Sequence, residues 1–339
     1  MFKLNIQRHA AGEVVHTTTG TASNSTGNIT PYGENGLTTE MKTYYSAYLI
    51  DMAEPKLVHD QFGQKHPIPK NGGKTIEFRK YDPLPKMETP LTEGVTPNGQ
   101  KLDVKVVTAE VKQYGGFVEL SDMLLLAAID NNLVQATKLL GGQAGRTLDT
   151  ITREVLAGGT NVQYAEGQVD SRSALKGGKD GDILTVDAVR KAVRYLKRMN
   201  AETINGSYVG IIHPDAAYDL MSDPKWINVK TYSDPEGIYQ GEIGKIENVR
   251  FVESSEAKIW EGAGASGADV YSTLILGENA YGTTEISGGG LQHIVKQLGS
   301  AGTADPLNQR ATAGWKATKA AVRLVEPYMI RIETASTFN

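Results

Sequence analysis

Apolar and polar positions alternate along two segments that together predict a long β-hairpin. Residues 74–81 place Ile76 and Phe78 on one face and charged side chains on the other, which is the period of a strand. The returning segment repeats the pattern, with apolar residues at Leu102, Val104 and Val106. The tip between them, residues 82–99, holds four prolines and is longer than an ordinary turn. Because a two-stranded ribbon is marginal in water on its own, we expect this tip to lie on a neighbouring subunit.

A long amphipathic helix is predicted over residues 133–157, where it should act as a spine. Its apolar positions form one stripe at three- and four-residue steps, at Leu133, Leu140, Ala144, Leu148, Ile151 and Val155. We therefore expect Leu148 and Ile151 to lie in a core. Glycines interrupt the helix at Gly141, Gly142 and Gly145. Since glycine lowers helix propensity, close packing or a bend is expected there.

Helix and strand patterns then alternate, which predicts a second region over residues 184–290. Thr185 is a good N-cap for a helix that buries Val186, Val189, Val193 and Leu196. The next predicted elements are a strand at 208–212, a helix from Pro214, and strands at 249–252 and 270–276. The glycine-rich segment 160–183 before this region is predicted to be a loop or linker.

From residue 291 the pattern returns to strands, predicted at 291–298, 315–325 and 328–333. In the last of these, Ile330 and Ile332 alternate with charged residues, so one face should be buried and the other exposed. The long loop 299–312 joins the first two strands. It concentrates directional hydrogen-bonding groups, at Asp305, Asn308, Gln309 and Arg310.

Composition limits the function classes. With 339 residues, the chain exceeds the roughly 250–300 at which a single core stops growing, so we expect two packed regions with extensions. Residues 17–39 are rich in Thr, Ser, Gly and Asn and are predicted to form an arm. The net charge of −4 gives the chain no overall positive potential that would attract nucleic acid. The lack of cysteine excludes disulfides and thiolate metal sites. The first nine residues lack the apolar stretch of a secretory signal.

Candidate chemistry is sparse. The glycine pattern at 262–267 matches G-x-G-x-x-G, but a predicted strand follows it where a dinucleotide site needs a helix. His59, Asp60 and His66 lie in a segment punctuated by proline and glycine and are predicted to be surface residues. Histidine spacing gives no metal site, and no cofactor is expected. His213, Pro214 and Asp215 mark a predicted helix entry, with Asp215 in the first turn. The sequence shows no catalytic constellation, so we predict that the protein is not an enzyme.

The sequence resembles a known family, the N-four-type phage major capsid proteins, a branch of the phage Hong Kong 97 capsid fold. The most specific segments are IPKNGGKTIEFRK at 68–80, PLTEGVTP at 90–97 and LGSAGTADPLNQR at 298–310. Further matching segments are 58–64, 147–149, 153–156 and 212–215. The first 40 residues carry no part of the resemblance.

The resemblance implies an α+β fold of the Hong Kong 97 type, with an N-terminal arm, an extended β-hairpin loop, a spine-helix peripheral domain and an α/β axial domain. The corresponding divisions are an arm and short helix at 1–55, the extended loop at 56–112, the peripheral domain at 113–183 with its spine at 133–157, the axial domain at 184–290, and return strands of the peripheral domain at 291–339. Capsomer centres would be formed by the axial domain.

The implied function is that of a major capsid protein of a tailed double-stranded DNA phage, assembled in the host cytoplasm through pentamers and hexamers into an icosahedral shell. The expected partners are other copies of the chain, the portal protein, and scaffold or decoration proteins. Packaged DNA would be held by loose contact, and no membrane partner is expected. Candidate assembly residues are Pro83, Lys86, Glu93, Asp305, Asn308, Gln309 and Arg310. The alternatives are a nonviral encapsulin-type compartment and a hydrolase that uses His213 and Asp215.

Overall fold

The computed structural model describes most of the chain from residue 58 onward. The described residues are 49, 58–67, 74–81, 84–91, 93–94, 96, 99–102, 104–123, 132–165, 170–179, 181–226, 244–285, 291–300 and 305–339. The predicted arm at 17–39 lies outside them, as does Pro83. The chain divides into two compact units, considered separately below. The smaller includes Gly115–Gly141 and Gln292–Lys316, and the larger includes Ala53–Tyr114, Gly142–Leu291 and Ala317–Asn339.

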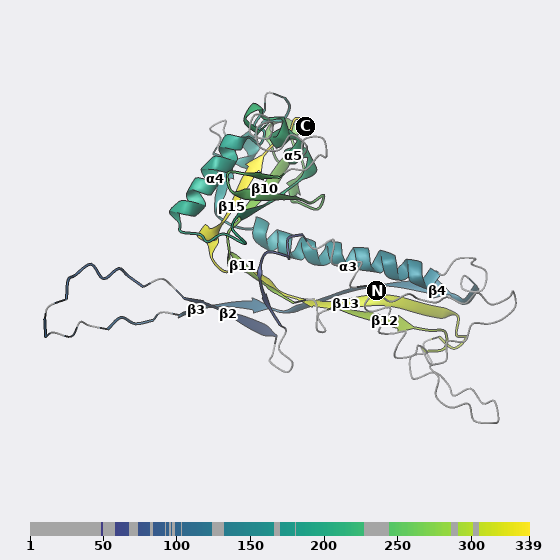
Figure 1. Ribbon diagram of the computed structural model, residues 1–339. Coiled ribbons are helices and arrows are strands. Elements are labelled where there is room, and N and C mark those ends of the chain that lie inside the picture. Colours follow the sequence, from purple (N-terminus) through teal and green to yellow (C-terminus); the bar gives the residue numbers. More distant parts are fainter. Residues whose placement is uncertain are drawn as a thin grey trace. The chain divides into compact units, whose positions relative to one another are not determined.

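A seven-stranded mixed sheet forms the centre of the larger unit (Figure 1). Its strand order is β5 (Val162–Tyr164), β15 (Met329–Thr334), β10 (Val270–Leu276), β6 (Tyr208–Ile212), β8 (Val249–Glu253) and β7 (Lys245–Ile246), with β9 (Ile259–Trp260) paired to β10. β10 is antiparallel to both of its main neighbours, β15 and β6, whereas β6 and β8 are parallel. All described residues of β6, β10 and β15 are buried, so this sheet is the core of the unit.

Two helices cover this sheet and start where the sequence predicted. In α4 (Val186–Arg198) the side chain of Thr185 accepts a hydrogen bond from the backbone N–H of Ala188, and the predicted apolar face is buried. In α5 (Pro214–Ser222) the ring of His213 accepts from the N–H of Asp215. Both caps satisfy backbone donors that a helix start leaves without an intrahelical partner. The predicted helix entry with Asp215 in the first turn is therefore confirmed, and His213 is its N-cap.

The structure differs from the sequence predictions for this unit at segment 160–183 and at the last strand. Segment 160–183 is more than a loop, because β5 lies in it, a single 3-10 turn covers Arg172–Ala174, and Leu175 is fully buried. The last strand is buried on both faces rather than one. Arg331 and Glu333 remain buried because they are paired, with 2.8 Å between Arg331 Nε and Glu333 Oε1. β15 also pairs with β10, so it belongs to the α/β sheet rather than to the return strands.

The extended hairpin consists of β2 (Thr75–Tyr81) and β3 (Val104–Glu110), close to the predicted bounds. Ile76 and Phe78 are buried as predicted. The returning strand has the opposite face inward from the one expected, because Ile76 pairs with Ala109 and Phe78 with Val107. Val104 and Val106 consequently lie on the outer face, 43% and 50% exposed.

A small sheet lies at the base of this hairpin. Its strand order is β1 (Gln64–His66), β11 (Tyr281–Thr284) and β14 (Ala321–Arg323). β1 runs parallel to β11, and Gln64 pairs with Gly282. The hairpin core continues into this sheet, since Ile76, Phe78 and Ala109 cluster with Ala320, and Val322 packs against them. Three chain segments far apart in sequence therefore meet at the hairpin base.

The spine helix α3 spans Asn132–Ala157, as the apolar stripe predicted. Leu140, Ala144 and Leu148 are buried, but Ile151 is only half-buried. The stripe instead continues through two polar positions, Asp149 and Thr152, each 0% exposed. The buried side chains of Asp149 and Thr152 need hydrogen-bond partners from other segments of the chain.

The C-terminal end of α3 is capped by arginines from the last strands. Arg331 Nη1 donates to the carbonyl oxygens of Ala157 and of Gly159, the latter at 3.0 Å, and Arg323 Nη1 donates to the carbonyl oxygen of Val155 at 3.0 Å. These carbonyls have no partner within the helix, and positive charge is favourable at this end of the helix dipole. None of the helices in the described residues is long and apolar enough to cross a bilayer.

The smaller unit is built on a three-stranded sheet in the order β12 (Leu291–Lys296), β13 (Arg310–Lys319) and β4 (Lys112–Ser121). Most residues of β4 are exposed, including Phe117 at 68%. Arg310 was predicted to lie in a loop but is the first residue of β13.

We predict that Leu148→Ala lowers the free energy of unfolding by about 2–5 kcal/mol, because Leu148 is 0% exposed and its loss leaves a cavity. Denaturant unfolding of the subunit measures this. Leu139→Ala on the same helix is the matched control, since Leu139 is 73% exposed and its truncation should change stability by less than about 0.5 kcal/mol. Equal effects of the two variants would contradict the assignment.

A buried polar network at the base of the extended loop

The turn that precedes β1 contains two adjacent polar residues that are buried. His59 is 1% exposed and Asp60 is 4% exposed, which corrects the prediction that both lie on the surface. The third member of that predicted group, His66, is half-buried and stacks edge-on against Phe78. Buried ionisable groups are rare without partners, so this turn must be matched by groups from other segments.

His59 is matched by Asp149 of α3. The ring Nδ1 lies 2.7 Å from one carboxylate oxygen of Asp149, and the backbone N–H of His59 donates to the other oxygen at 2.6 Å. The hydroxyl of Tyr281 donates to the carbonyl oxygen of His59. One carboxylate thus holds both the backbone and the ring of His59, which fixes the turn against the helix.

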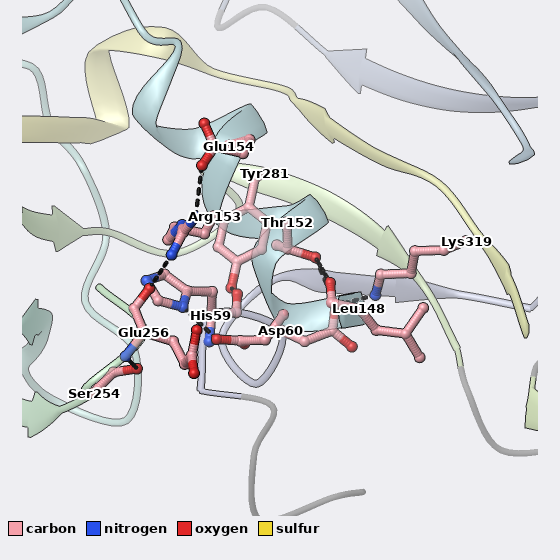
Figure 2. Close-up of polar contacts among 11 residues, drawn as sticks. His59, Asp60, Leu148, Thr152, Arg153, Glu154, Ser254, Glu256, Tyr281 and Lys319 are labelled. Carbon is pink, nitrogen blue, oxygen red and sulfur yellow. Dashed lines mark hydrogen bonds and ion pairs between the residues drawn. The ribbon is translucent and has the colours of Figure 1, made fainter. Parts of the chain in front are cut away.

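Asp60 is matched by Lys319, the last residue of β13. Lys319 Nζ contacts Asp60 Oδ1, and both side chains are almost fully buried. The same oxygen accepts from the hydroxyl of Thr283 at 2.6 Å and from that of Thr152 at 3.4 Å. Thr283 Oγ1 also contacts Lys319 Nζ. Figure 2 shows His59, Asp60, Thr152, Tyr281 and Lys319 converging from separate segments.

The electrostatics of this network are those of a closed structural cluster. Burial lowers the pKa of Lys319, and the nearby carboxylates of Asp60 and Asp149 oppose that shift. Burial also raises the pKa of Tyr281 well above its usual value, and Asp60 adds to this effect. Because burial disfavours the charged form of Lys319, its ammonium group depends on the buried carboxylate beside it.

A second polar cluster lies beside the network on the exposed side of α3 (Figure 2). Arg153 donates to Glu154 at 2.7 Å and to the carbonyl oxygen of Glu256 at 2.6 Å, and Lys258 Nζ lies 2.9 Å from Glu154. Burial raises the pKa of Glu154, but hydrogen bonds from Lys258 and Arg153 outweigh this and leave it lowered. A groove of about 370 Å³ beside it is lined mainly by Gln143, Arg146, Thr147, Thr150 and Ile151.

The other candidate chemistry serves local structure. His213 and Asp215 form the cap of α5, burial lowers the pKa of His213, and the neighbouring Asp215 opposes that shift. The glycine pattern at 262–267 is a turn followed directly by β10, as its context predicted. In the described part of the chain, no three metal-ligating side chains are grouped to hold an ion.

The predicted assembly residues fall in two places. Lys86 and Glu93 are exposed in the tip of the hairpin, while Pro83 lies outside the described residues. The other group lies at the start of β13. Asn308 and Gln309 of the preceding turn and Arg310, the first residue of the strand, are exposed.

Asp305 belongs to the same turn but is only 7% exposed. Its carboxylate accepts from the backbone N–H of Arg310 at 2.8 Å, and its carbonyl oxygen accepts from the N–H of Asn308 at 3.1 Å. Asp305 therefore shapes the turn that presents the exposed residues.

The family of the chain is shown by comparison with known proteins. The family model for phage capsid protein matches residues 125–297, just over half of the 339 residues. The chain therefore belongs to the phage capsid protein family, whose members are structural proteins. No curated protein matches the chain.

Solved capsid structures share the fold. The capsid of cyanophage Pam1 superposes with a TM-score of 0.63 at 14% identity, covering 95% of this chain and 100% of that chain. The capsid of cyanophage P-SCSP1u gives 0.61 at 14% identity, with 93% of each chain covered. The capsid of Ralstonia phage GP4 gives 0.60 at 15% identity, covering 78% of this chain and 84% of that chain. The predicted α+β capsid fold of the Hong Kong 97 type is confirmed.

We predict that Lys319→Met lowers the free energy of unfolding by about 3–5 kcal/mol, since it leaves the Asp60 carboxylate buried without its cation. Adding Asp60→Asn to the same chain removes that charge and keeps an acceptor for the threonine hydroxyls, so the double variant should recover most of the loss. Chemical denaturation at neutral pH measures both. A single variant as stable as the wild type would show that the pair is not buried as described.

Proposed function

We propose that this protein is the major capsid subunit of a tailed double-stranded DNA phage and that it assembles through pentamers and hexamers into an icosahedral shell. The observation that carries this is the uncovered tip of the extended hairpin. Its exposed apolar side chains include Leu84 at 54%, Met87 at 61% and Leu91 at 76%. Burying such side chains on another subunit gains roughly 25 cal/mol per Å² of apolar surface. A second copy is the partner that a shell supplies.

The rival functions have less support. A nonviral encapsulin-type compartment is not favoured, because the matching family model is that of phage capsid proteins. A hydrolase using His213 and Asp215 is not favoured either, because the hydrogen bond between them serves as a helix cap.

We propose the remaining partners on physical grounds. A net charge of −4 suits loose, non-specific contact with packaged DNA rather than tight binding. Portal and scaffold or decoration proteins would complete the particle, which would assemble in the host cytoplasm. The divisions at 1–55, 56–112, 113–183, 184–290 and 291–339 are proposed as arm, extended loop, peripheral domain, axial domain and return strands, with β15 added to the axial sheet.

We predict that amide hydrogen exchange at residues 84–91 is fast in the free subunit and slow in assembled shells. In the subunit every residue of this segment is exposed, and exposed loop amides exchange readily. Exchange followed by mass spectrometry on the two states measures the difference, with the buried strand β10 as the internal reference. Equal exchange of 84–91 in both states would contradict an interface role for the tip.

We predict that Arg310→Ala leaves the subunit folded, with an unchanged circular dichroism spectrum, but prevents the formation of closed shells. Its exposed guanidinium suits bidentate pairing with a carboxylate of another copy. Truncating one member of such a desolvated pair costs about 2–5 kcal/mol. Arg194→Ala on α4 is the matched control, because it also truncates an exposed arginine. This variant should form closed shells at the normal yield. Negative-stain microscopy counts shells, and a normal yield from Arg310→Ala would remove this residue from the interface.

A further inference from the structure

Two aromatic rings at the hairpin base fill spaces that only glycine leaves open. A Cβ atom at Gly282 would lie 2.3 Å from Cε1 of Phe78, and one at Gly63 would lie 2.4 Å from Cε2 of Tyr281. Both distances are far shorter than a carbon–carbon contact. Gly63 directly precedes β1 and Gly282 lies in β11, the strand that pairs with β1. The two rings therefore interlock the hairpin, the turn before β1 and the small sheet.

The ring of Phe78 is enclosed on its other sides as well. Phe78 is 0% exposed and clusters with Ile76, Ala109 and Ala320. The ring of His66 meets it edge-on, with centroids 4.7 Å apart and planes inclined at 72°. Close-packed aromatic side chains have few alternative rotamers. The packing of Phe78 thus favours a single position of the hairpin on the small sheet.

The polar network holds the same turn. Asp60 is bound to Lys319 of β13 and to Thr283 of β11, and His59 is bound to Asp149 of α3. A half-broken set of buried charges is costly. The polar pairs therefore fix the turn and the small sheet against which Phe78 packs, and the apolar interlock joins the hairpin to that sheet.

The tip differs from the base in this respect. All described residues from 84 to 102 are exposed. Their described contacts include one hydrogen bond, from Gln100 Nε2 to the carbonyl oxygen of Pro85 at 3.2 Å. The same loop thus combines a packed base with an uncovered end.

We infer that Phe78 and Tyr281, seated on Gly282 and Gly63, are positioning residues that set the direction of the hairpin within the free subunit, before a second copy binds. The inference rests on the proposed function, and it names how the loop is prepared for assembly. A loop held in its bound direction loses less freedom on association than a loose one. The tip of the hairpin would then make the contacts with the neighbouring subunit.

The absence of cysteine from the sequence allows two cysteines to be labelled uniquely. Val106→Cys places a spin label on the outer face of β3, and Lys197→Cys places one on α4, both in the larger unit and both exposed. Pulsed electron paramagnetic resonance on the free subunit should give one narrow distance distribution. Shells that contain a trace of labelled subunit should give the same mean. A broad distribution in the free subunit, or a shifted mean in the shell, would overturn the inference.

A set of glycine variants tests the interlock. In the labelled chain, Gly282→Ala should shift or broaden the distribution, because the new Cβ displaces the Phe78 ring. Adding Phe78→Val removes the ring atoms nearest that Cβ and should restore a narrow distribution, even if Gly282→Ala alone folds poorly. Gly142→Ala is the matched control, since a Cβ there meets nothing within 4 Å.

An unchanged distribution in Gly282→Ala, or the same broadening in Gly142→Ala, would overturn the role of the interlock. These measurements on the free subunit do not require assembly. Failure of the wild-type chain to form shells would therefore count against the proposed function and leave the inference standing or falling on its own data.

Discussion

Two carboxylates and two nitrogen bases are buried together beneath the extended hairpin, and they can stay there only while each is paired. Asp149 takes both the ring and the backbone N–H of His59, and Asp60 takes Lys319 together with two threonine hydroxyls. Removing one partner would strand a charge in a medium that solvates it poorly. The geometry of the turn, the helix and the small sheet is therefore mutually dependent.

Buried charged groups are also paired where the spine helix meets the α/β sheet. Glu333 is 0% exposed and accepts from two arginines, Arg172 and Arg331. Arg331 also donates to the carbonyl oxygen of Ala157, the last residue of α3, and the guanidinium carbon of Arg172 lies 3.7 Å from the centroid of the Trp260 ring. Paired buried charges hold segments in register because a shift of either partner leaves a group unsatisfied. Apolar contacts alone tolerate such shifts more readily.

This arrangement explains how a phage capsid protein can lack an evident active site among its described residues and yet contain many perturbed ionisable groups. The burial that shifts the pKa of Lys319 and Tyr281 leaves their polar atoms engaged with other parts of the same chain. The proposed interface residues lie elsewhere, on the exposed apolar tip and on the turn that Asp305 shapes before β13.

The sequence by itself determined the elements whose signals are local. Period-two alternation gave β2, the apolar stripe gave α3, and capping residues gave the start of α4. The resemblance of several segments to phage capsid proteins supplied the fold. These inferences need only neighbours within a few residues, or a match to a known pattern.

Tertiary structure decided which polar residues are buried. Asp149 is 90 residues from His59, and Lys319 is 259 residues from Asp60, so no local pattern distinguishes these residues from solvated ones. The inner face of β3 was likewise set by its pairing with β2, because a register change of one residue exchanges the two faces of a strand. Burial of a charge depends on a partner that only the folded chain brings near, and that partner is not encoded in the segment itself.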